Sequence, residues 1–360
     1  MLGQIPSELY RSIHRQPEIV RSVLAQSVGS IDAAVELLAP CERIYTVGTG
    51  TSGHAATVAA FLLEAVGVPA QPLSSFDFAN YPPRLGPQDG VLAISHSGTN
   101  RYGLRAIETA VAARVPLVGV TGRESPMAGP GVVVRTTPPE TSSTHTQSYT
   151  GNLAAIALLA CGLGSRRGQD LGSLPTDLAA VPAHMESILR REDEIVPTAD
   201  RLAAIGRLVL AGAGPNAATA REGALKVKES SYLVAEGFEL EMILHGGLQP
   251  LRSGDVSVAV VVRGPAVPRA EDILRTWKIV GTQTLLVADA EVARRLRAHP
   301  DLGPFDTLEV PTVAEPLSPI LTVLPLQLLA AATAQRRGTN ADTFRRDDPV
   351  FARAIASYEF

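Results

Sequence analysis

The sequence predicts an α/β protein built from two tandem copies of one unit, each a parallel sheet with helices on both faces. Residues 43–50 and 207–214 are both apolar runs that end in Gly-x-Gly and lead into an alanine-rich helical pattern. A second pair of apolar runs begins at Asp89 and Asp255. Because the paired features occur in the same order at similar spacing, we interpret them as an internal repeat of α/β type.

Strand and helix patterns follow in the same order within each copy. The first copy predicts strands at 43–49, 91–95, 116–121 and 132–135, and helices at 52–66 and 102–113. The second predicts strands at 207–211, 256–262, 283–287 and 307–310, and helices at 217–235, 269–279 and 319–336. Apolar strands that alternate with helices are typical of a parallel sheet buried on both faces.

The same patterns divide the chain into five segments. Residues 12–36 have the periodicity of one main helix, which precedes the first unit. The segments we expect are an N-terminal helical arm at 1–40, a first α/β unit at 41–165, a helical linker at 166–200, a second α/β unit at 201–337 and a tail at 338–360.

Composition narrows the function classes. Of 360 residues, 45% are hydrophobic and 19% charged, which is typical of globular proteins with full cores. The net charge of −4 argues against nucleic acid or a membrane surface as a partner. Cys41 and Cys161 are isolated, which favours a reducing, cytoplasmic location without a structural metal. The N-terminus lacks a signal-peptide pattern, and the apolar stretches 152–164 and 316–334 are expected to be buried helices.

A glycine-rich turn, from Gly48 to Gly53, joins the first predicted strand to its helix. Such a turn presents backbone N–H groups at the positive end of the helix dipole and is suited to an anion. The Gly-x-Gly-x-x-Gly spacing also fits a dinucleotide site, but residues 68–76 provide no acid for the ribose. We therefore favour a small anion over a nicotinamide cofactor.

A second polar turn, Ser95-His96-Ser97-Gly98-Thr99-Asn100, also lies between a buried strand and a helix. Its hydroxyl, imidazole and N–H groups suit a dianionic phosphate without a metal. An ordinary helix N-cap would explain the same composition. Two such turns in one unit, with a third hydroxyl cluster at 141–146, favour a phosphoester pocket.

The predicted helix 217–235 carries Glu222, Lys226 and Glu229 on one face, at positions i, i+4 and i+7. A solvated ion pair is the ordinary explanation for this pattern. The many alanines nearby instead predict a largely buried helix, where a Glu–Lys pair marks a candidate active site. His245 follows an apolar run and precedes two glycines, so it is either structural or part of a ligand-facing loop.

These segments resemble the double-SIS (sugar isomerase) family, in particular the isomerase half of glucosamine-6-phosphate synthase. The matching motifs are Gly50-Thr51-Ser52-x-His54-Ala55, Ile94-Ser95-His96-Ser97-Gly98, Glu222-Gly223-Ala224-Leu225-Lys226-Val227-Lys228-Glu229, Leu244-His245-Gly246 and Pro325-Leu326-Gln327-Leu328-Leu329-Ala330. The resemblance covers nearly the whole chain. It implies two SIS-type units of flavodoxin-like or Rossmann-like fold, each an α-β-α sandwich.

The resemblance also implies a role for each matching residue. Those implied to hold the sugar phosphate are Ser52, Ser95, His96, Ser97 and, at the last position of the turn, Asn100. Those implied to contact the substrate elsewhere are Gly50, Thr51, Thr99 and Ser143. Glu229 would move a proton between C1 and C2, and Lys226 would orient Glu229. His245 would assist ring opening, reaching the neighbouring subunit's site in a homodimer. No metal and no organic cofactor are implied.

Three departures from the family pattern bear on the reaction. The glutaminase domain of the synthase has no counterpart in this sequence, which argues against amino-sugar synthesis. The phosphate turn ends in Asn100, where the family usually has a threonine. No lysine follows Lys278, so the family's tail lysine is absent, and Arg345 or Arg346 would have to replace it.

These considerations predict an enzyme that acts on an amino-hexose 6-phosphate. The leading hypothesis is an isomerase/deaminase that converts glucosamine 6-phosphate towards fructose 6-phosphate. The first alternative is a dehydratase that uses the same base on N-acetylglucosamine 6-phosphate, and the second is a non-catalytic phosphosugar sensor. A sensor of the transcription-regulator kind would require a helix-turn-helix before residue 40, where one main helix is expected.

Overall fold

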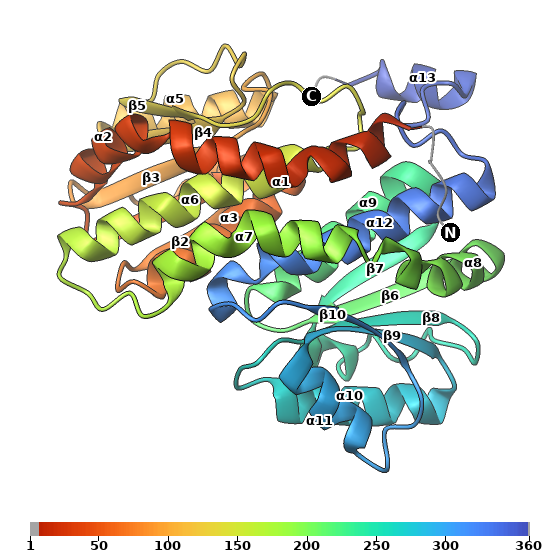
Figure 1. Cartoon of the computed structure of the whole chain (residues 1–360). Coiled ribbons are helices and arrows are strands. Elements are labelled where there is room, and N and C mark those ends of the chain that lie inside the picture. The colour runs from red at the N-terminus through yellow and green to blue at the C-terminus, as the bar shows by residue number, and fades with distance from the viewer. Residues whose placement is uncertain (1–6, 359–360) are drawn as a thin grey trace. The chain divides into compact units, whose positions relative to one another are not determined.

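The computed structural model describes residues 7–358, which form two compact units (Figure 1). The first unit contains residues 15–140, 145–182 and 349–358. The second contains residues 7–14, 141–144 and 183–348. Each unit holds one parallel sheet of five strands, so the predicted α/β class with two parallel-sheet units is confirmed.

The sheet of the first unit has the strand order β2-β1-β3-β4-β5, with every neighbouring pair parallel. Its strands are β1 (Arg43–Gly48), β2 (Ala70–Ser74), β3 (Asp89–Ile94), β4 (Leu117–Thr121) and β5 (Val132–Arg135). Val47 lies opposite both Leu73 and Ala93, so β1, β2 and β3 end at the same edge of the sheet. Ligands of open parallel sheets bind at this carboxyl edge.

Helices cover both faces of the first sheet. They are α2 (Val28–Leu38), α3 (Thr51–Glu64), α4 (Ser75–Asn80), α5 (Arg101–Ala113) and α6 (Gln147–Arg166), with α13 (Pro349–Ile355) near the chain's end. Tyr45, Val47 and Val91 alternate along their strands towards a core that α4 and α5 complete. The helices α2 and α3 each pack on α6. The strands β3 and β4 in the middle of the sheet are buried along their whole length.

The sheet of the second unit has the order β10-β9-β8-β6-β7. Its strands are β6 (Arg207–Gly212), β7 (Val234–Glu239), β8 (Val256–Val260), β9 (Gln283–Asp289) and β10 (Asp306–Val310). Counted from β7, this is the connection pattern of the first sheet, strand for strand. The structure thus confirms the internal repeat.

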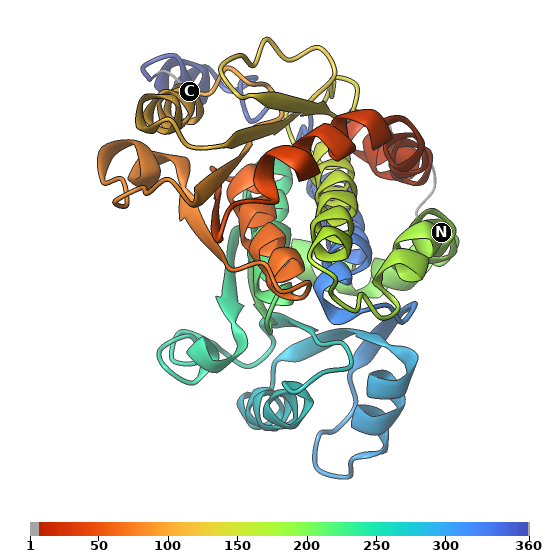
Figure 2. The ribbon, with the colours of Figure 1, turned by 90° about the vertical axis from the view of Figure 1, so that its left-hand side faces the viewer.

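The helices of the second unit also lie on both faces of its sheet. They are α8 (Val196–Ile205), α9 (Asn216–Ser231), α10 (Val267–Val280), α11 (Ala290–Ala298) and α12 (Pro319–Arg337), with short 3₁₀ turns η1 (Glu192–Ile195), η2 (Leu240–Ile243) and η3 (Glu315–Leu317). Figures 1 and 2 show α10 and α11 on the same side of the sheet. Two further helices, α1 (Glu8–Gln26) and α7 (Leu174–Leu189), contain residues of both units.

The apolar helix α12 is a core helix of the second unit. Within the described residues, 315–337 is the only helical stretch with the length and composition of a membrane span, and its apolar window is wholly buried. It packs along α9, and a Cβ on Gly223 would lie 2.6 Å from Leu326 Cδ1. Gly223 therefore permits the close approach of α9 to α12. The expectation of a buried helix at 316–334 is confirmed.

Two helices are shorter than the sequence analysis predicted. The predicted helix 12–36 is two helices, α1 and α2, and α2 buries Ile31 and Val35 against the first unit. The predicted helix 217–235 ends at Ser231, because Tyr232 adopts a left-handed conformation (φ 58°) and the chain continues into β7. No glycine marks that helix end, so the usual sequence signal was missing.

Candidate functional site

The first glycine-rich turn lies at the carboxyl end of β1. A Cβ on Gly48 would lie 2.2 Å from the carbonyl oxygen of Ser52, so only glycine lets the helix start this close to the strand. Gly50 has a positive φ (58°) and precedes α3, whose first residues are Thr51 and Ser52. Both are half-buried. The backbone N–H groups of this first turn provide the predicted setting for an anion.

The second polar turn follows β3, the neighbour of β1, and so lies at the same edge of the first sheet. Ser95 Oγ accepts a hydrogen bond from Gly98 N at 3.2 Å. Ser97 Oγ accepts from Thr99 N at 3.3 Å and lies 3.0 Å from Thr99 Oγ1. These bonds shape the turn and keep its hydroxyls together. The sequence expectation that two hydroxyl-bearing turns share one edge holds for this unit.

Asn100 is the N-cap of α5. Its Oδ1 accepts a hydrogen bond from Gly103 N at 3.0 Å, which is the capping alternative considered from the sequence. A side-chain amide donates only through its nitrogen. Any contact between Asn100 and phosphate must therefore use Nδ2 while the oxygen caps the helix.

His96 lies in a pocket of about 370 Å³ whose lining includes Ser97, Arg123, Glu140 and His145. Its ring meets that of His145 edge-on, with centroids 5.2 Å apart. Burial lowers the pKa of His96, the charge of His145 lowers it further, and Glu140 opposes both effects. The neutral imidazole is therefore favoured at neutral pH, and His96 would meet phosphate as a hydrogen-bonding group.

Glu140 fixes one wall of this pocket. Its carboxylate accepts hydrogen bonds from the backbone N–H groups of Thr146, Gln147 and Ser148, at 2.7, 3.1 and 2.9 Å. It thereby satisfies free N–H donors at the start of α6. Its place in the pocket was missed, because the residues that meet it in space carry no recognisable spacing.

The third hydroxyl cluster is divided between the two units. Residues 141–144 belong to the second unit, where Ser143 N donates to the carbonyl of Asp342 at 2.9 Å and Thr144 Oγ1 donates to the carbonyl of Ala341 at 2.8 Å. Arg346 Nη1 lies 3.4 Å from Ser143 Oγ. The segment 338–348 therefore packs against Ser143, the residue predicted to contact the sugar.

The predicted Glu–Lys face of α9 is buried in the second unit. Glu222 is 0% exposed, Lys226 is 1% exposed and the Glu229 side chain is 12% exposed. Lys226 Nζ lies 2.6 Å from Glu229 Oε2 and 3.5 Å from Glu222 Oε1. A solvated ion pair is thereby excluded. The arrangement instead holds one ammonium between two carboxylates, with Glu229 the more accessible of the two.

His245 lies in a turn after η2 and is exposed. Its Nε2 is 3.1 Å from Glu241 Oε1, and Glu241 also pairs with Arg269. Hydrogen bonds from Arg269 lower the pKa of Glu241 to about 2, with a smaller contribution from His245. The apolar sequence before His245 does not bury it, so the histidine is not a core residue.

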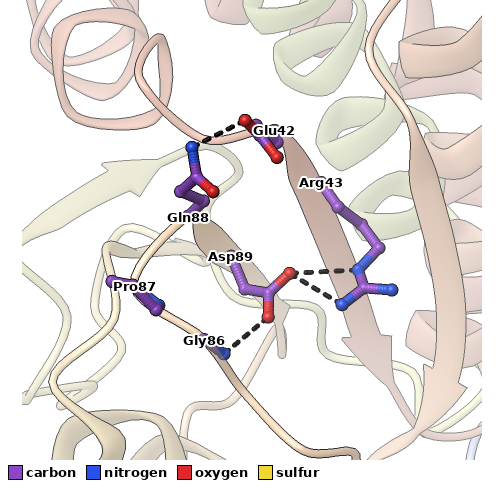
Figure 3. Close-up of a pocket in the computed structure, with 6 residues that line it drawn as sticks. All are labelled: Glu42, Arg43, Gly86, Pro87, Gln88 and Asp89. Carbon is purple, nitrogen blue, oxygen red and sulfur yellow. Dashed lines mark hydrogen bonds and ion pairs between the residues drawn. The ribbon is translucent and has the colours of Figure 1, made fainter.

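Another pocket, of about 410 Å³, lies at the opposite edge of the first sheet (Figure 3). Here Arg43 Nε donates to Asp89 Oδ1 at 3.0 Å, and Gly86 N donates to Asp89 Oδ2 at 2.7 Å. Gln88 Nε2 donates to Glu42 Oε1 at 2.6 Å. Because these bonds join the starts of β1 and β3, we interpret this pocket as structural.

The dinucleotide alternative gains no support from the second strand. Ser74 ends β2, and its Oγ accepts from Asp77 N at 3.0 Å and donates to Asp77 Oδ2 at 2.8 Å. Asp77 is thus held as part of the N-terminal cap of α4. No acid is present at the end of β2 itself.

Comparison with known proteins identifies the first unit. Residues 37–161 match the SIS domain family. The matched residues include both hydroxyl-bearing turns of the first sheet and end within α6, so the similarity to the SIS domain includes the part of the chain that forms this edge.

Similarity to curated proteins extends over most of the chain. The chain is 32% identical over 349 residues to the glutamine–fructose-6-phosphate aminotransferase (isomerizing) of Gloeobacter violaceus, and the alignment covers 93% of this chain and 56% of the relative. The chain thus spans about half the length of the curated relatives it matches. The predicted resemblance to the isomerase half of glucosamine-6-phosphate synthase is confirmed.

Solved structures show the same fold. The C-terminal domain of glucosamine-fructose-6-phosphate aminotransferase from Francisella tularensis superposes with a TM-score of 0.87 at 22% identity, over 95% of this chain and 100% of that one. A glucosamine-6-phosphate deaminase from Thermotoga maritima superposes with a TM-score of 0.71 at 17% identity, over 93% and 97%. The chain thus shares its fold with these two proteins.

Proposed function

We propose that this protein catalyses ring opening and C1/C2 proton transfer on an amino-hexose 6-phosphate, as a glucosamine-6-phosphate isomerase/deaminase. The observation that carries the proposal is the buried Lys226–Glu229 pair. The Glu229 carboxylate lies 2.6 Å from an almost fully buried ammonium. Burying such an ion pair costs desolvation free energy, so its presence in a protein interior points to a catalytic or binding role. Proton abstraction next to a carbonyl requires such a base together with a positive group near the developing oxyanion.

The proposed reaction balances without an added reagent. The Glu229 carboxylate takes the C2 proton of the open-chain amino-aldose, and the electrons of the C2–H bond form an enolamine. Protonated Glu229 then returns the proton to C1, which gives the 2-imine of fructose 6-phosphate. Water adds to the imine and ammonia leaves, so that glucosamine 6-phosphate and water yield fructose 6-phosphate and ammonia.

Phosphate recognition is assigned to the two turns of the first unit. The N-termini of α3 and α5, which follow these turns, and the hydroxyls of Ser52, Ser95 and Ser97 provide neutral hydrogen-bond donors. Such donors are sufficient to bind a dianion. We assign Lys226 the role of keeping Glu229 ionised and oriented between proton transfers.

The dehydratase remains the second candidate because of the tail. No lysine follows Lys278 in the sequence, and the cation nearest Ser143 is Arg346, 3.4 Å away. A guanidinium stays protonated and cannot form an imine with the sugar carbonyl. A tail that binds the substrate only by charge and hydrogen bonds is compatible with loss of the C3 hydroxyl from N-acetylglucosamine 6-phosphate after Glu229 removes the C2 proton.

We further propose a cytoplasmic homodimer in which His245 acts in the neighbouring subunit's site. Its exposure leaves the imidazole available to a partner, and Glu241 orients it at 3.1 Å. Mixing two inactive variants, Glu229→Gln and His245→Ala, tests this directly. Random dimers would regain about one quarter of wild-type activity if each site takes Glu229 from one subunit and His245 from the other. No recovery, or a monomer in sedimentation, contradicts the shared site.

Product analysis tests the reaction itself. The purified protein is incubated separately with glucosamine 6-phosphate and N-acetylglucosamine 6-phosphate, and products are followed by proton NMR and an ammonia assay. Fructose 6-phosphate and ammonia from the free amine support the isomerase/deaminase. An unsaturated product from the acetylated sugar replaces it with the dehydratase, and no product from either sugar contradicts both and favours a sensor.

A further inference from the structure

The pocket behind the second turn contains three side chains that are typical metal ligands. His96, Glu140 and His145 each offer one ligand atom, and the three atoms all lie within 4.8 Å of one another. All three residues are half-buried, line the same pocket and belong to the first unit. Neither cysteine of the chain takes part.

Two of these side chains, His96 and Glu140, are held by their surroundings. The His96 ring packs over Gly122, where a Cβ would lie 2.9 Å from the ring's Cε1. His96 Nδ1 is 3.4 Å from Thr137 Oγ1, a position from which a hydroxyl orients the ring. Three N–H groups of α6 fix the Glu140 carboxylate. Metal-binding histidines and carboxylates are commonly oriented by such partners.

The charges around the cluster favour a cation over a second anion. The Glu140 carboxylate lies beside two imidazoles, and each of the three side chains offers one ligand atom to the cluster. The guanidinium of Arg123, which lines the same pocket, donates to Ser22 Oγ, Gln26 Oε1 and the carbonyl of Thr136, at 2.8, 3.0 and 3.2 Å. It is therefore hydrogen-bonded to neutral acceptors that are not part of the cluster. A carboxylate beside two imidazoles supplies donor atoms that a divalent cation takes.

We propose that His96, Glu140 and His145 form a binding site for a divalent transition metal of the Zn²⁺ class. Two imidazoles and one carboxylate are a common donor set for Zn²⁺, with the fourth position open to water or substrate. Ligand atoms on a tetrahedral Zn²⁺ are roughly 3.3 Å apart, so binding requires the side chains to close by at most about 1.5 Å. Glu140 is held by the N–H groups at the start of α6, so the proposal assigns this closure to the two histidine side chains.

The site predicts a place for the fourth ligand. Ser97 lines the same pocket, so the open position of the metal would face the hydroxyl-bearing turn. An oxygen of an anionic substrate, or water in its absence, is the ligand that this geometry would accept.

A metal titration of the tag-free, chelator-treated protein tests the proposal. We expect one equivalent of Zn²⁺ to bind by calorimetry, and Co²⁺ to give the intense visible bands of a tetrahedral site. His96→Gln and His145→Ala should each weaken binding by about 10–100-fold. His299→Ala, which alters a half-buried histidine of the second unit, should bind as the wild type does.

Circular dichroism shows whether each variant is folded, and His96→Gln keeps a polar side chain of similar size in case His145→Ala disturbs the pocket. Absence of saturable Zn²⁺ and Co²⁺ binding overturns the proposal. So does binding that remains unchanged in the folded His96→Gln and His145→Ala variants, or that is lost equally in His299→Ala. None of these readouts depends on the enzymatic reaction proposed above.

Discussion

Replacing Lys226 by methionine should strongly destabilise the second unit. The side chain is 1% exposed, and its ammonium lies 2.6 and 3.5 Å from two carboxylates, one of which is fully buried. Methionine fills a similar volume but leaves Glu222 and Glu229 without their shared positive charge. Removing one partner of a buried ion pair costs about 3–5 kcal/mol, because the remaining charge stays desolvated.

The loss is large compared with the whole free energy of unfolding of a domain, which is about 5–15 kcal/mol. Urea unfolding at pH 7.5 should show a midpoint lowered by about 1–5 M, for an m-value of about 1–3 kcal/mol/M. The chain's single tryptophan, Trp277, is fully buried in the second unit, so its fluorescence follows the unit that contains the pair.

Two further variants separate the charge effect from loss of packing. Lys228→Met changes an exposed lysine on the same helix and should alter stability by about 0.5 kcal/mol or less. The double variant Glu222→Gln/Lys226→Met removes one of the stranded carboxylates and should be more stable than Lys226→Met alone. If Lys226→Met is no more destabilising than Lys228→Met, the buried ion pair does not contribute as argued.

Three further predictions concern the first unit. Asn100→Ala should lower the free energy of unfolding by about 1 kcal/mol, because it removes the cap of α5. Asn100→Asp should keep the cap but weaken phosphate-ester binding. If thermal unfolding shows that both variants are destabilised, the division of roles between Oδ1 and Nδ2 is wrong. Because the pKa of His96 is lowered from 6.5 in the folded state, the unfolded chain binds its proton more readily, and stability is lost as pH falls from about 6.5 towards the lower folded pKa. Urea unfolding should therefore show a smaller loss between pH 7.5 and 5 for His96→Gln than for wild type, and parallel pH profiles would refute the assignment. Burial raises the pKa of Cys161 to about 11 and also raises that of Cys41, so both thiols should react slowly with disulfide reagents at pH 8 until the protein is unfolded, and rapid native reaction would argue against their burial.

The repeat in the sequence was sufficient to predict both sheets, because Gly-x-Gly after a buried strand is a strong local pattern. The edge strands β2 and β7 were harder to predict. β2 is largely exposed and lacks alternating apolar residues, and β7 continues directly from a helix that ends without glycine. Their positions depend on tertiary pairing with β1 and β6, which local sequence does not encode.

The site residues likewise include some that local sequence predicts and some that it does not. The turns after β1 and β3 were predictable, because residues close in sequence form each of them. The burial of Glu222 and Lys226 was predicted from the alanines around them, because the spacing of the pair alone equally fits a solvated helix face. The meeting of His96 with Glu140 and His145 depends on the sheet bringing together segments more than 40 residues apart, and no local motif announces it.

The central claim is that Glu229 transfers the C2 proton of an amino-hexose 6-phosphate. The most direct test is loss of the C2–H proton NMR signal in deuterated water, measured for wild type, Glu229→Gln and the exposed control Glu236→Gln. We predict exchange by wild type and Glu236→Gln, and a loss of about 10²–10⁴-fold in Glu229→Gln with phosphate-ester binding retained. Undiminished exchange in the folded Glu229→Gln variant, or no exchange by wild type with either sugar, would contradict the claim.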